Sequence, residues 1–365
     1  MKYFFIPACL LVAPLQGQDL FKSVFPAGAS RVDSEVDGIF SSDIKVVSFT
    51  TRFQQQRGKT LYRFGVGRTD HDVDYAPAPG TFTLPESLRE EAYNVEFGVQ
   101  HDYRPDLQFN LSATYSDGFT DHRSLWISEF YRQSFQFLPS FEDPDPLSFS
   151  TSTGFEWDIS SKHKLVGSYS FSRARIVSGN AIDPVTFDDV VIEEPYLNTH
   201  SGSLRWETVI GNRIRTQQTF QVSRVDAREE RFQFRSDWAL GLTDKLTLRL
   251  QAGVADEDPA FEAYYGGVSL AYEVTPHWQI DLGYRRYEDT GEITASNFNT
   301  AAPGLSSAEY TISALYQTGS TSVRASLGIF DSDFDPITNP ENTVFANLFR
   351  DREFVTARIA FTRTF

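Results

Sequence analysis

The sequence of 365 residues holds a single cysteine and no run of 18 apolar residues. One cysteine cannot form an intrachain disulfide and argues against a cysteine-ligated metal site. Without a long apolar run, no transmembrane helix is expected. Lysine is scarce as well, with 7 Lys against 26 Arg, and the formal net charge is −16. Such a charge argues against a nucleic-acid partner, since proteins that bind phosphate backbones are basic.

Recognisable enzyme motifs are missing too. The six histidines are scattered without an HExxH pair, and there is no GxSxG and no phosphate-binding glycine loop. His71 lies between Asp70 and Asp72, but catalytic pairs in barrels are assembled from different strands, so adjacency is weak evidence. We therefore expect no enzymatic activity and no catalytic residue.

Aromatic residues are abundant instead, at 15% with 32 Phe and 16 Tyr, although hydrophobic residues reach only 40%. Apolar and polar residues alternate strictly over long stretches, which predicts β-strands without a competing helical period. We expect strands near 44–53, 60–69, 91–103, 107–117, 147–159, 164–175, 197–209, 213–224, 229–242, 245–255, 263–275, 277–288, 306–318, 320–331 and 353–365.

Three features favour a transmembrane antiparallel β-barrel over a soluble sandwich. The strands exceed the usual five or six residues. Their polar face is too charged for a packed core, and their apolar face is too aromatic for water. The connections alternate between tight turns and the long links 70–90, 118–146, 176–196, 288–304 and 331–351, as in bacterial outer-membrane barrels.

A closed bacterial barrel has an even number of strands with both termini on the same side. Fifteen strands are expected above, so a further ascending strand is expected within 20–40, where the pattern is weaker. We favour sixteen strands, and fourteen is the alternative. We expect no plug domain of about a hundred residues before the strands, which argues against a TonB-dependent transporter.

The N-terminal segment has the features of a secretory signal peptide. Lys2, an apolar run to Val12 and small residues before Gln18 predict a signal peptide over 1–17, followed by one barrel domain over 18–365. Cys9 is then removed with the signal; a lipidation site at Cys9 is the alternative.

The final segment, 353–365, alternates apolar and polar residues and ends on Phe365. It resembles the C-terminal recognition strand of Gram-negative outer-membrane β-barrels, and the chain as a whole is porin-like in size. The resemblance implies integral residence in the outer membrane, contact with its lipid and lipopolysaccharide, and an insertion machinery that reads the strand ending at Phe365. Arg363 departs from the pattern, because an apolar residue is more usual there. By analogy with sixteen-stranded porins, a homotrimer is one possible oligomeric state.

With the aromatic face outward, the other face lines the lumen, and its charges are sorted along the chain. The arginines would form a basic patch on one wall, with acidic residues elsewhere, so that both signs act on a permeating solute. Alternatively, the arginines pair with neighbouring carboxylates and stiffen the wall. The candidate pore-lining residues are Arg205, Arg213, Arg215, Arg231, Arg235, Arg249, Glu96, Glu156 and Asp158.

The longest link, 118–146, combines acidic and aromatic residues, which predicts that it packs against something rather than lying in solvent. One interpretation folds it into the lumen, where Glu142, Asp143 and Asp145 would line a constriction. The other makes it an ordered external lid.

Two acidic runs place three carboxylates each at alternate positions: Asp70, Asp72 and Asp74, and Asp331, Asp333 and Asp335. Their oxygens could converge on Ca²⁺ or Mg²⁺, although neither run has the glycine or distant glutamate of an EF-hand loop. Solvated strand tips are the simpler interpretation. Acidic tips that face lipopolysaccharide phosphates through bridging divalent ions are a third. We expect no cofactor.

The expected function is an outer-membrane pore for passive diffusion of small hydrophilic solutes or ions through a charged lumen. Acidic loops enrich cations at the mouth while the basic patch opposes them inside, which predicts a weak cation preference. The alternatives are a substrate-specific or gated transporter or export barrel, and a closed structural or surface barrel.

Overall fold

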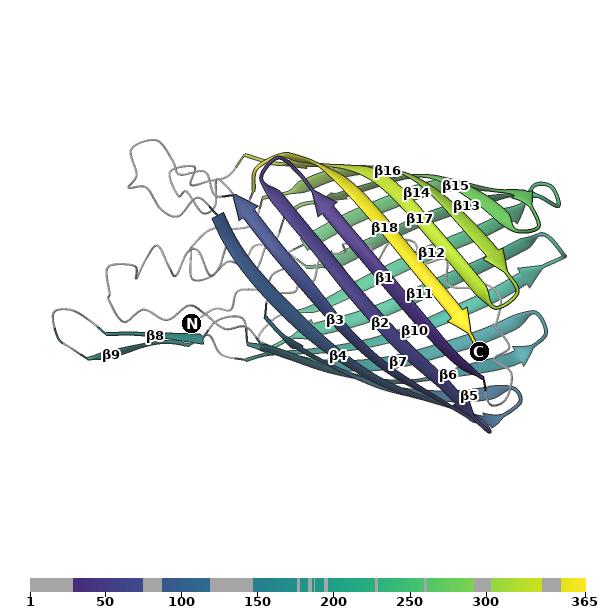
Figure 1. Cartoon of the computed structure of the whole chain (residues 1–365), viewed down its shortest axis with the longest axis horizontal. Coiled ribbons are helices and arrows are strands. Elements are labelled where there is room, and N and C mark those ends of the chain that lie inside the picture. Colours follow the sequence, from purple (N-terminus) through teal and green to yellow (C-terminus); the bar gives the residue numbers. More distant parts are fainter. Residues whose placement is uncertain are drawn as a thin grey trace.

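The computed structural model describes residues 29–74, 87–118, 147–175, 178–182, 186, 188–193, 196–226, 229–258, 261–291, 303–336 and 349–365. Sixteen of the strands in these ranges close into one antiparallel barrel, which confirms the all-β class and the favoured strand count (Figure 1). The count of fourteen is wrong. Within the described ranges, no helix is long and apolar enough to cross a membrane.

The barrel follows chain order, except that β7 pairs directly with β10 and β1 closes the ring against β18. The barrel strands are β1 (Ser30–Phe40), β2 (Ile44–Arg57), β3 (Thr60–Asp74), β4 (Ser87–Arg104), β5 (Leu107–Asp117), β6 (Leu147–Ser160), β7 (His163–Arg175), β10 (Leu197–Ile210), β11 (Ile214–Val225), β12 (Glu230–Gly241), β13 (Leu246–Glu257), β14 (Phe261–Thr275), β15 (Trp278–Asp289), β16 (Leu305–Thr318), β17 (Thr321–Phe334) and β18 (Arg352–Thr364).

The two ends of the barrel differ in how the strands are joined. At the turn end, where Figure 1 places the C-terminus, hairpins close through short turns. Gly58, Gly211 and Gly319 stand in three of these turns with φ of 58°, 60° and 46°, a conformation that costs glycine little. The opposite end, called the loop end here, carries the long links.

Two details differ from the expectation. β3 extends to Asp74, β4 begins at Ser87 and β17 extends to Phe334, so the links after β3 and β17 are shorter than expected. The segment 176–196 also holds two short strands, β8 (Ser178–Ile182) and β9 (Asp189–Glu193), paired as a separate sheet beyond the loop end (Figure 1). Neither strand alternates apolar and polar residues, since β9 has three consecutive apolar residues and β8 ends on two, so the period-two pattern could not reveal them.

In the described part of the chain, most large apolar side chains of the barrel point outward, and only a few, such as Phe261 and Phe354, are buried on the inner face. Phe64, Phe97 and Leu282 are 50%, 49% and 52% exposed, whereas the alternate positions carry glycine, serine, glutamine and charged residues. Period-two alternation thus gives the wall an aromatic outer face and a polar inner face.

Aromatic residues mark both rims of the outer face. The four tryptophans in the described part of the chain, Trp157, Trp206, Trp238 and Trp278, each lie within four residues of the turn-end terminus of their strand. Four exposed tyrosines lie in the loop-end half of their strands, namely Tyr93, Tyr115, Tyr264 and Tyr310, whereas Tyr62, Tyr103 and Tyr272 join the tryptophans near the turn end. These two girdles were not predicted from the sequence, although the position of each of these tryptophans close to a tight turn was a readable signal.

The ring closes where β1 meets β18, and this junction is called the seam. Ten residue pairs join the strands, from Arg31 opposite Thr364 to Phe40 opposite Val355. At the turn end, the backbone N–H groups of Ser30 and Phe365 each donate to the other residue's carbonyl oxygen, at 3.3 Å and 2.8 Å. The expected strand within 20–40 is therefore confirmed as β1.

Candidate functional site

The inner face carries most of the charges that the sequence singled out. On β10–β12, arginine and carboxylate alternate in the same strand: Arg205 contacts Glu207 at 2.9 Å, and Arg235 contacts Asp237 at 2.7 Å. Residues two apart on a strand share a face, so Arg-x-Glu and Arg-x-Asp can pair locally. Register then aligns the two pairs, because Thr219 lies opposite both arginines and Gln217 lies opposite both carboxylates.

Two further arginines reach carboxylates on other strands. Arg231 on β12 donates through Nε and Nη2 to Glu257 on β13, at 2.9 Å and 2.8 Å. This pair is almost enclosed, with side chains 12% and 6% exposed. Arg249 on β13 reaches across β14 to Asp281 on β15, at 3.1 Å.

The remaining two arginines of the basic patch differ in position. Arg215 lies on the inner face of β11, between Val209 and Ala239 in the register. Arg213 belongs to the turn between β10 and β11, where its 61% exposed side chain pairs with Asp244 at 3.3 Å. A residue in that turn lies at the mouth of the barrel rather than on its wall, so the strand boundary of 213 was one residue too early.

The predicted acidic residues are paired as well. Glu96 on β4 accepts two hydrogen bonds from Arg52 on β2, at 2.8 Å and 2.9 Å. The bridge passes over Gly65 on β3, where an added Cβ would lie 3.1 Å from both partners. Glu156 and Asp158 on β6 share Lys164 on β7, at 3.3 Å and 3.4 Å.

The inner face therefore presents fixed charges of both signs, largely engaged with one another. Most arginines of the basic patch contact a carboxylate, in line with the second of the two interpretations given above. The paired side chains still belong to the inner face of the wall. Whether these residues line an open channel stays a prediction.

A second set of charges lies along the seam. Arg358 on β18 pairs with Glu35 on β1 and reaches Asp37 at 3.4 Å. The Thr362 hydroxyl donates to Asp33 at 2.5 Å. The alternation of Asp33, Glu35 and Asp37 was the available signal, but β1 has serine and glycine at several outer positions, so its apolar half was faint.

The loop end of the seam is closed by Arg352, which donates to the Asp43 carboxylate in the turn between β1 and β2, with contacts of 2.9–3.2 Å. The two side chains are 5% and 10% exposed. Burial raises the pKa of the Asp43 carboxyl, but the hydrogen bonds and the charge of Arg352 outweigh it, so this pKa lies below its usual value.

The acidic runs lie at the loop-end termini of β3 and β17, with Asp335 directly after the last residue of β17. Arg68 contacts Asp70 at 2.7 Å and Arg89 contacts Asp72 at 3.4 Å, on the outer face. Among the described residues, no group of three or more acidic, histidine or cysteine side chains is arranged to hold a metal ion. The signal peptide 1–17 and the constriction residues Glu142, Asp143 and Asp145 lie outside the described residues.

No family model and no curated protein matches the sequence. Among solved structures, the barrel is similar to CdiB from Acinetobacter baumannii, with a TM-score of 0.54, 10% identity, and coverage of 92% of this chain and 60% of that one. It also aligns with the ferric enterobactin receptor PfeA from Pseudomonas aeruginosa (TM-score 0.48, 9% identity, 84% and 54% covered) and with the Ralstonia pickettii toluene transporter TbuX (0.47, 10%, 93% and 90%).

The chain thus spans little more than half the length of CdiB and PfeA. Identities near 10% show the fold alone, and that fold is the one of outer-membrane β-barrel proteins.

Proposed function

We propose that this protein is an outer-membrane pore through which small hydrophilic solutes or ions diffuse passively. The observation that carries the proposal is the inner face, which keeps charged and polar groups along the whole circumference of a closed sixteen-stranded wall. Charged groups in a lumen hold water and act on permeating ions.

The outer face supports placement in a membrane. On β14, Tyr264 and Tyr272 are eight residues apart, and the outer positions between them carry only glycine, valine and leucine. At about 3.3 Å per residue and a tilt of about 40°, this band is about 20 Å tall, near the height of the apolar band of outer-membrane barrels. Aromatic girdles at both rims fit the same location.

Pairing inside the wall also supports a weak cation preference. Arg205, Arg231, Arg235 and Arg249 each have a carboxylate within 3.1 Å, so the basic patch opposes cations less than its arginine content suggests. The net charge of −16 then dominates the field at the mouth.

The test is single-channel conductance of the refolded protein in a planar bilayer with a KCl gradient. We expect steady ohmic steps with a small cation-selective reversal potential. A folded, heat-modifiable barrel that stays silent would refute the pore. A clear anion preference would leave the pore standing but contradict the account of its field.

The proposal extends to the surroundings of the barrel. It includes contact with outer-membrane lipid and lipopolysaccharide, delivery by a cleaved signal peptide, and insertion by a machinery that reads the strand ending at Phe365. No enzymatic step is required.

A further inference from the structure

The tight turns at the turn end carry an excess of exposed cations. The turns that follow β2, β4, β6, β10 and β12 are neighbours around the ring, and each contains or directly adjoins a Lys or Arg. Only two carboxylates, Asp106 and Asp244, lie in these five turns, all of which the structure describes. The exposed cations are called the basic rim here: Arg57, Lys59, Arg104, Lys162, Arg213 and Lys245.

The charges of the basic rim are available to an external partner. Within the described part of the chain, the ammonium groups of Lys59, Lys162 and Lys245 form no hydrogen bond and no ion pair, and all three residues are exposed. The two Arg–Asp pairs of these turns measure 3.3 Å, with arginine side chains 51% and 61% exposed. Exposed pairs of this kind contribute little, so the carboxylates do not commit the arginines.

The basic rim occupies one side of the circumference. The turns that follow β14 and β16 consist of Pro, His, Gly and Ser, without Lys or Arg. Beyond them, Arg363 on β18 lies with its guanidinium 5.1 Å from the centre of the Phe365 ring. An anionic partner is therefore attracted mainly along the arc from β2 to β13.

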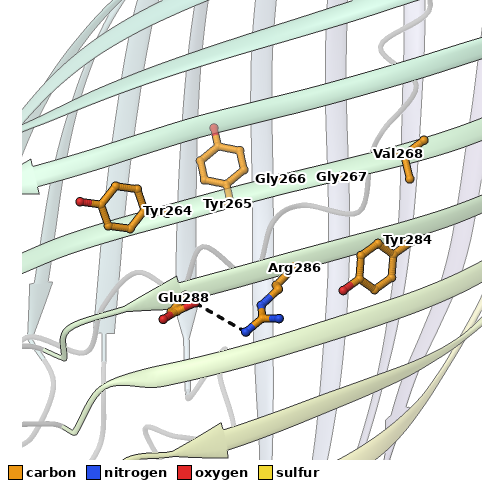
Figure 2. Close-up of a pocket in the computed structure, with 8 residues that line it drawn as sticks. All are labelled: Tyr264, Tyr265, Gly266, Gly267, Val268, Tyr284, Arg286 and Glu288. Atoms are coloured by element: carbon orange, nitrogen blue, oxygen red, sulfur yellow. Dashed lines mark ion pairs between the residues drawn. The ribbon is translucent and has the colours of Figure 1, made fainter.

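The loop end has charges of the opposite sign. The acidic runs on and directly after β3 and β17 alone place six carboxylates there. Figure 2 shows a loop-end cation, Arg286, beside Glu288 at 3.7 Å. Because the two ends differ in sign, an anionic partner is favoured at the turn end and disfavoured at the loop end.

The tryptophan girdle sets the depth of the basic rim. Trp157, Trp206 and Trp238 precede the ends of their strands by three or four residues, a height of about 8–10 Å at about 3.3 Å per residue and a tilt of about 40°. Tryptophan marks the headgroup level of a membrane. The rim is thus within about one Debye length of lipid phosphates, and flexible lysine stems can reach toward them.

We propose that the basic rim binds anionic phospholipids of the leaflet at the turn end, with the lipid phosphate as the ligand. Short turns of bacterial outer-membrane barrels face the periplasm, and the periplasmic leaflet of that membrane consists of phospholipid. Phosphatidylethanolamine brings an ammonium that the rim repels, whereas phosphatidylglycerol brings a net negative charge. Lys and Arg next to an anionic leaflet are attracted to it, and their N–H groups form charge-assisted hydrogen bonds with phosphate.

This inference rests on the membrane placement given under the proposed function, so the experiment first establishes insertion. The protein is refolded into vesicles of phosphatidylethanolamine and phosphatidylglycerol in equal amounts with identical acyl chains, and its heat-modifiability is verified. It is then extracted in mild detergent, and the retained lipids are measured by native mass spectrometry. A protein that fails to insert refutes the membrane placement. Conductance is recorded separately, so a silent barrel refutes the pore without affecting the lipid measurement.

The triple variant Lys59→Gln, Lys162→Gln and Lys245→Gln removes the free cations of the rim. We expect the wild-type protein to retain phosphatidylglycerol about fivefold over phosphatidylethanolamine, the value of about one Lys or Arg near an anionic surface. In the triple variant, this preference should fall below about twofold. A triple variant that inserts and keeps the full preference would overturn the proposal.

A matched control removes three cations from the outer face near the loop end, in the variant Lys45→Gln, Arg89→Gln and Arg286→Gln. The vesicles hold phosphatidylglycerol in both leaflets, so a general effect of lost charge would appear in both triple variants. We expect the control to keep the fivefold preference. An equal loss in both variants would overturn the assignment to the rim. Equal retention of the two lipids by the wild-type protein would refute the lipid ligand and favour an acidic soluble partner instead.

Discussion

Ion pairs on the inner and outer faces of the barrel wall differ in burial and in contact distance. On the inner face, Arg231 and Glu257 are 12% and 6% exposed and hold two short hydrogen bonds. On the outer face, Arg286 and Glu288 are 62% and 63% exposed and 3.7 Å apart. Removing one member of an enclosed ion pair lowers the free energy of unfolding strongly, whereas removing one member of an exposed pair changes it very little. The enclosed inner pairs therefore contribute to the stability of the barrel, and the exposed outer charges are available for external partners.

Removing Arg352 should give the largest loss of stability. The Arg352→Ala variant leaves the Asp43 carboxylate, which is only 10% exposed, without its main partner. We expect the free energy of unfolding to fall by roughly 3–5 kcal/mol, measured by urea titration of the refolded barrel. Arg350→Ala is the control, because Arg350 is 52% exposed and 3.9 Å from the same carboxylate. A similar loss in both variants would contradict the distinction between enclosed and exposed pairs.

Acid should weaken the same contact. The pKa of Asp43 is lower in the folded protein, so its stabilisation is complete above the unfolded pKa, about 3.9, and is lost as pH falls through the folded pKa. Unfolding titrations from about pH 5 down to about pH 2 should show this loss, and Asp43→Asn should show a smaller acid dependence. An unchanged acid dependence in Asp43→Asn would assign the effect to other carboxylates.

Filling the space at Gly65 should disturb the inner wall less severely. In Gly65→Val, the new side chain collides with the bridge between Arg52 and Glu96. Overpacking of this kind costs about 1–3 kcal/mol, measurable in the same urea titration. Gly202→Val on the outer face, where an added Cβ has open space, should lie within about 0.5 kcal/mol of the wild type.

Freeing two arginines should alter selectivity more than stability. In the double variant Glu207→Gln and Asp237→Asn, Arg205 and Arg235 lose the carboxylates they contact. A unit charge about 8 Å from an ion in water is worth about 0.5 kcal/mol. Two lost charges acting in opposite directions on K⁺ and Cl⁻ give about 2 kcal/mol, which a Debye length of about 10 Å roughly halves. The K⁺ to Cl⁻ permeability ratio should therefore fall about fivefold in reversal-potential measurements. Removal of two outer-face charges, Asp70→Asn with Glu91→Gln, should leave this ratio almost unchanged.

The smallest effect is expected at the turn end. Arg213 and Asp244 are 61% and 95% exposed, so Arg213→Ala should change the free energy of unfolding by less than about 0.5 kcal/mol. A loss above 2 kcal/mol would show that exposure is a poor guide to the value of these pairs.

Much of the barrel was readable from the sequence because one rule, alternation with period two, governs every barrel strand. The rule works best where the outer face is aromatic, as in β12 with Phe232, Phe234 and Trp238. It was weakest in β1, whose outer positions include serine and glycine, and it did not reveal the short strands β8 and β9.

The pairing of the inner charges was harder to predict from the sequence than the strands themselves. Arg205 and Glu207 are neighbours on one strand, so their contact follows from spacing alone. Arg249 and Asp281 meet only because register brings β13 and β15 together across β14, and register depends on turn lengths and bulges that a single sequence does not specify. Glu257 was missed for the same reason.

The seam has a consequence for how the barrel assembles. The hydrogen bond between Thr362 and Asp33 joins residues 329 positions apart, whereas the other barrel junctions join strands much nearer in the chain. Closing a flexible loop of this length costs roughly 2.5 kcal/mol more than closing one of about 20 residues. Consecutive strands should therefore pair first, and the ring should close last. The carboxylates of β1 and of the turn after it can then pair only when Arg358 and Arg352 arrive with the final strand, so these ion pairs fasten the barrel at the last step of its closure.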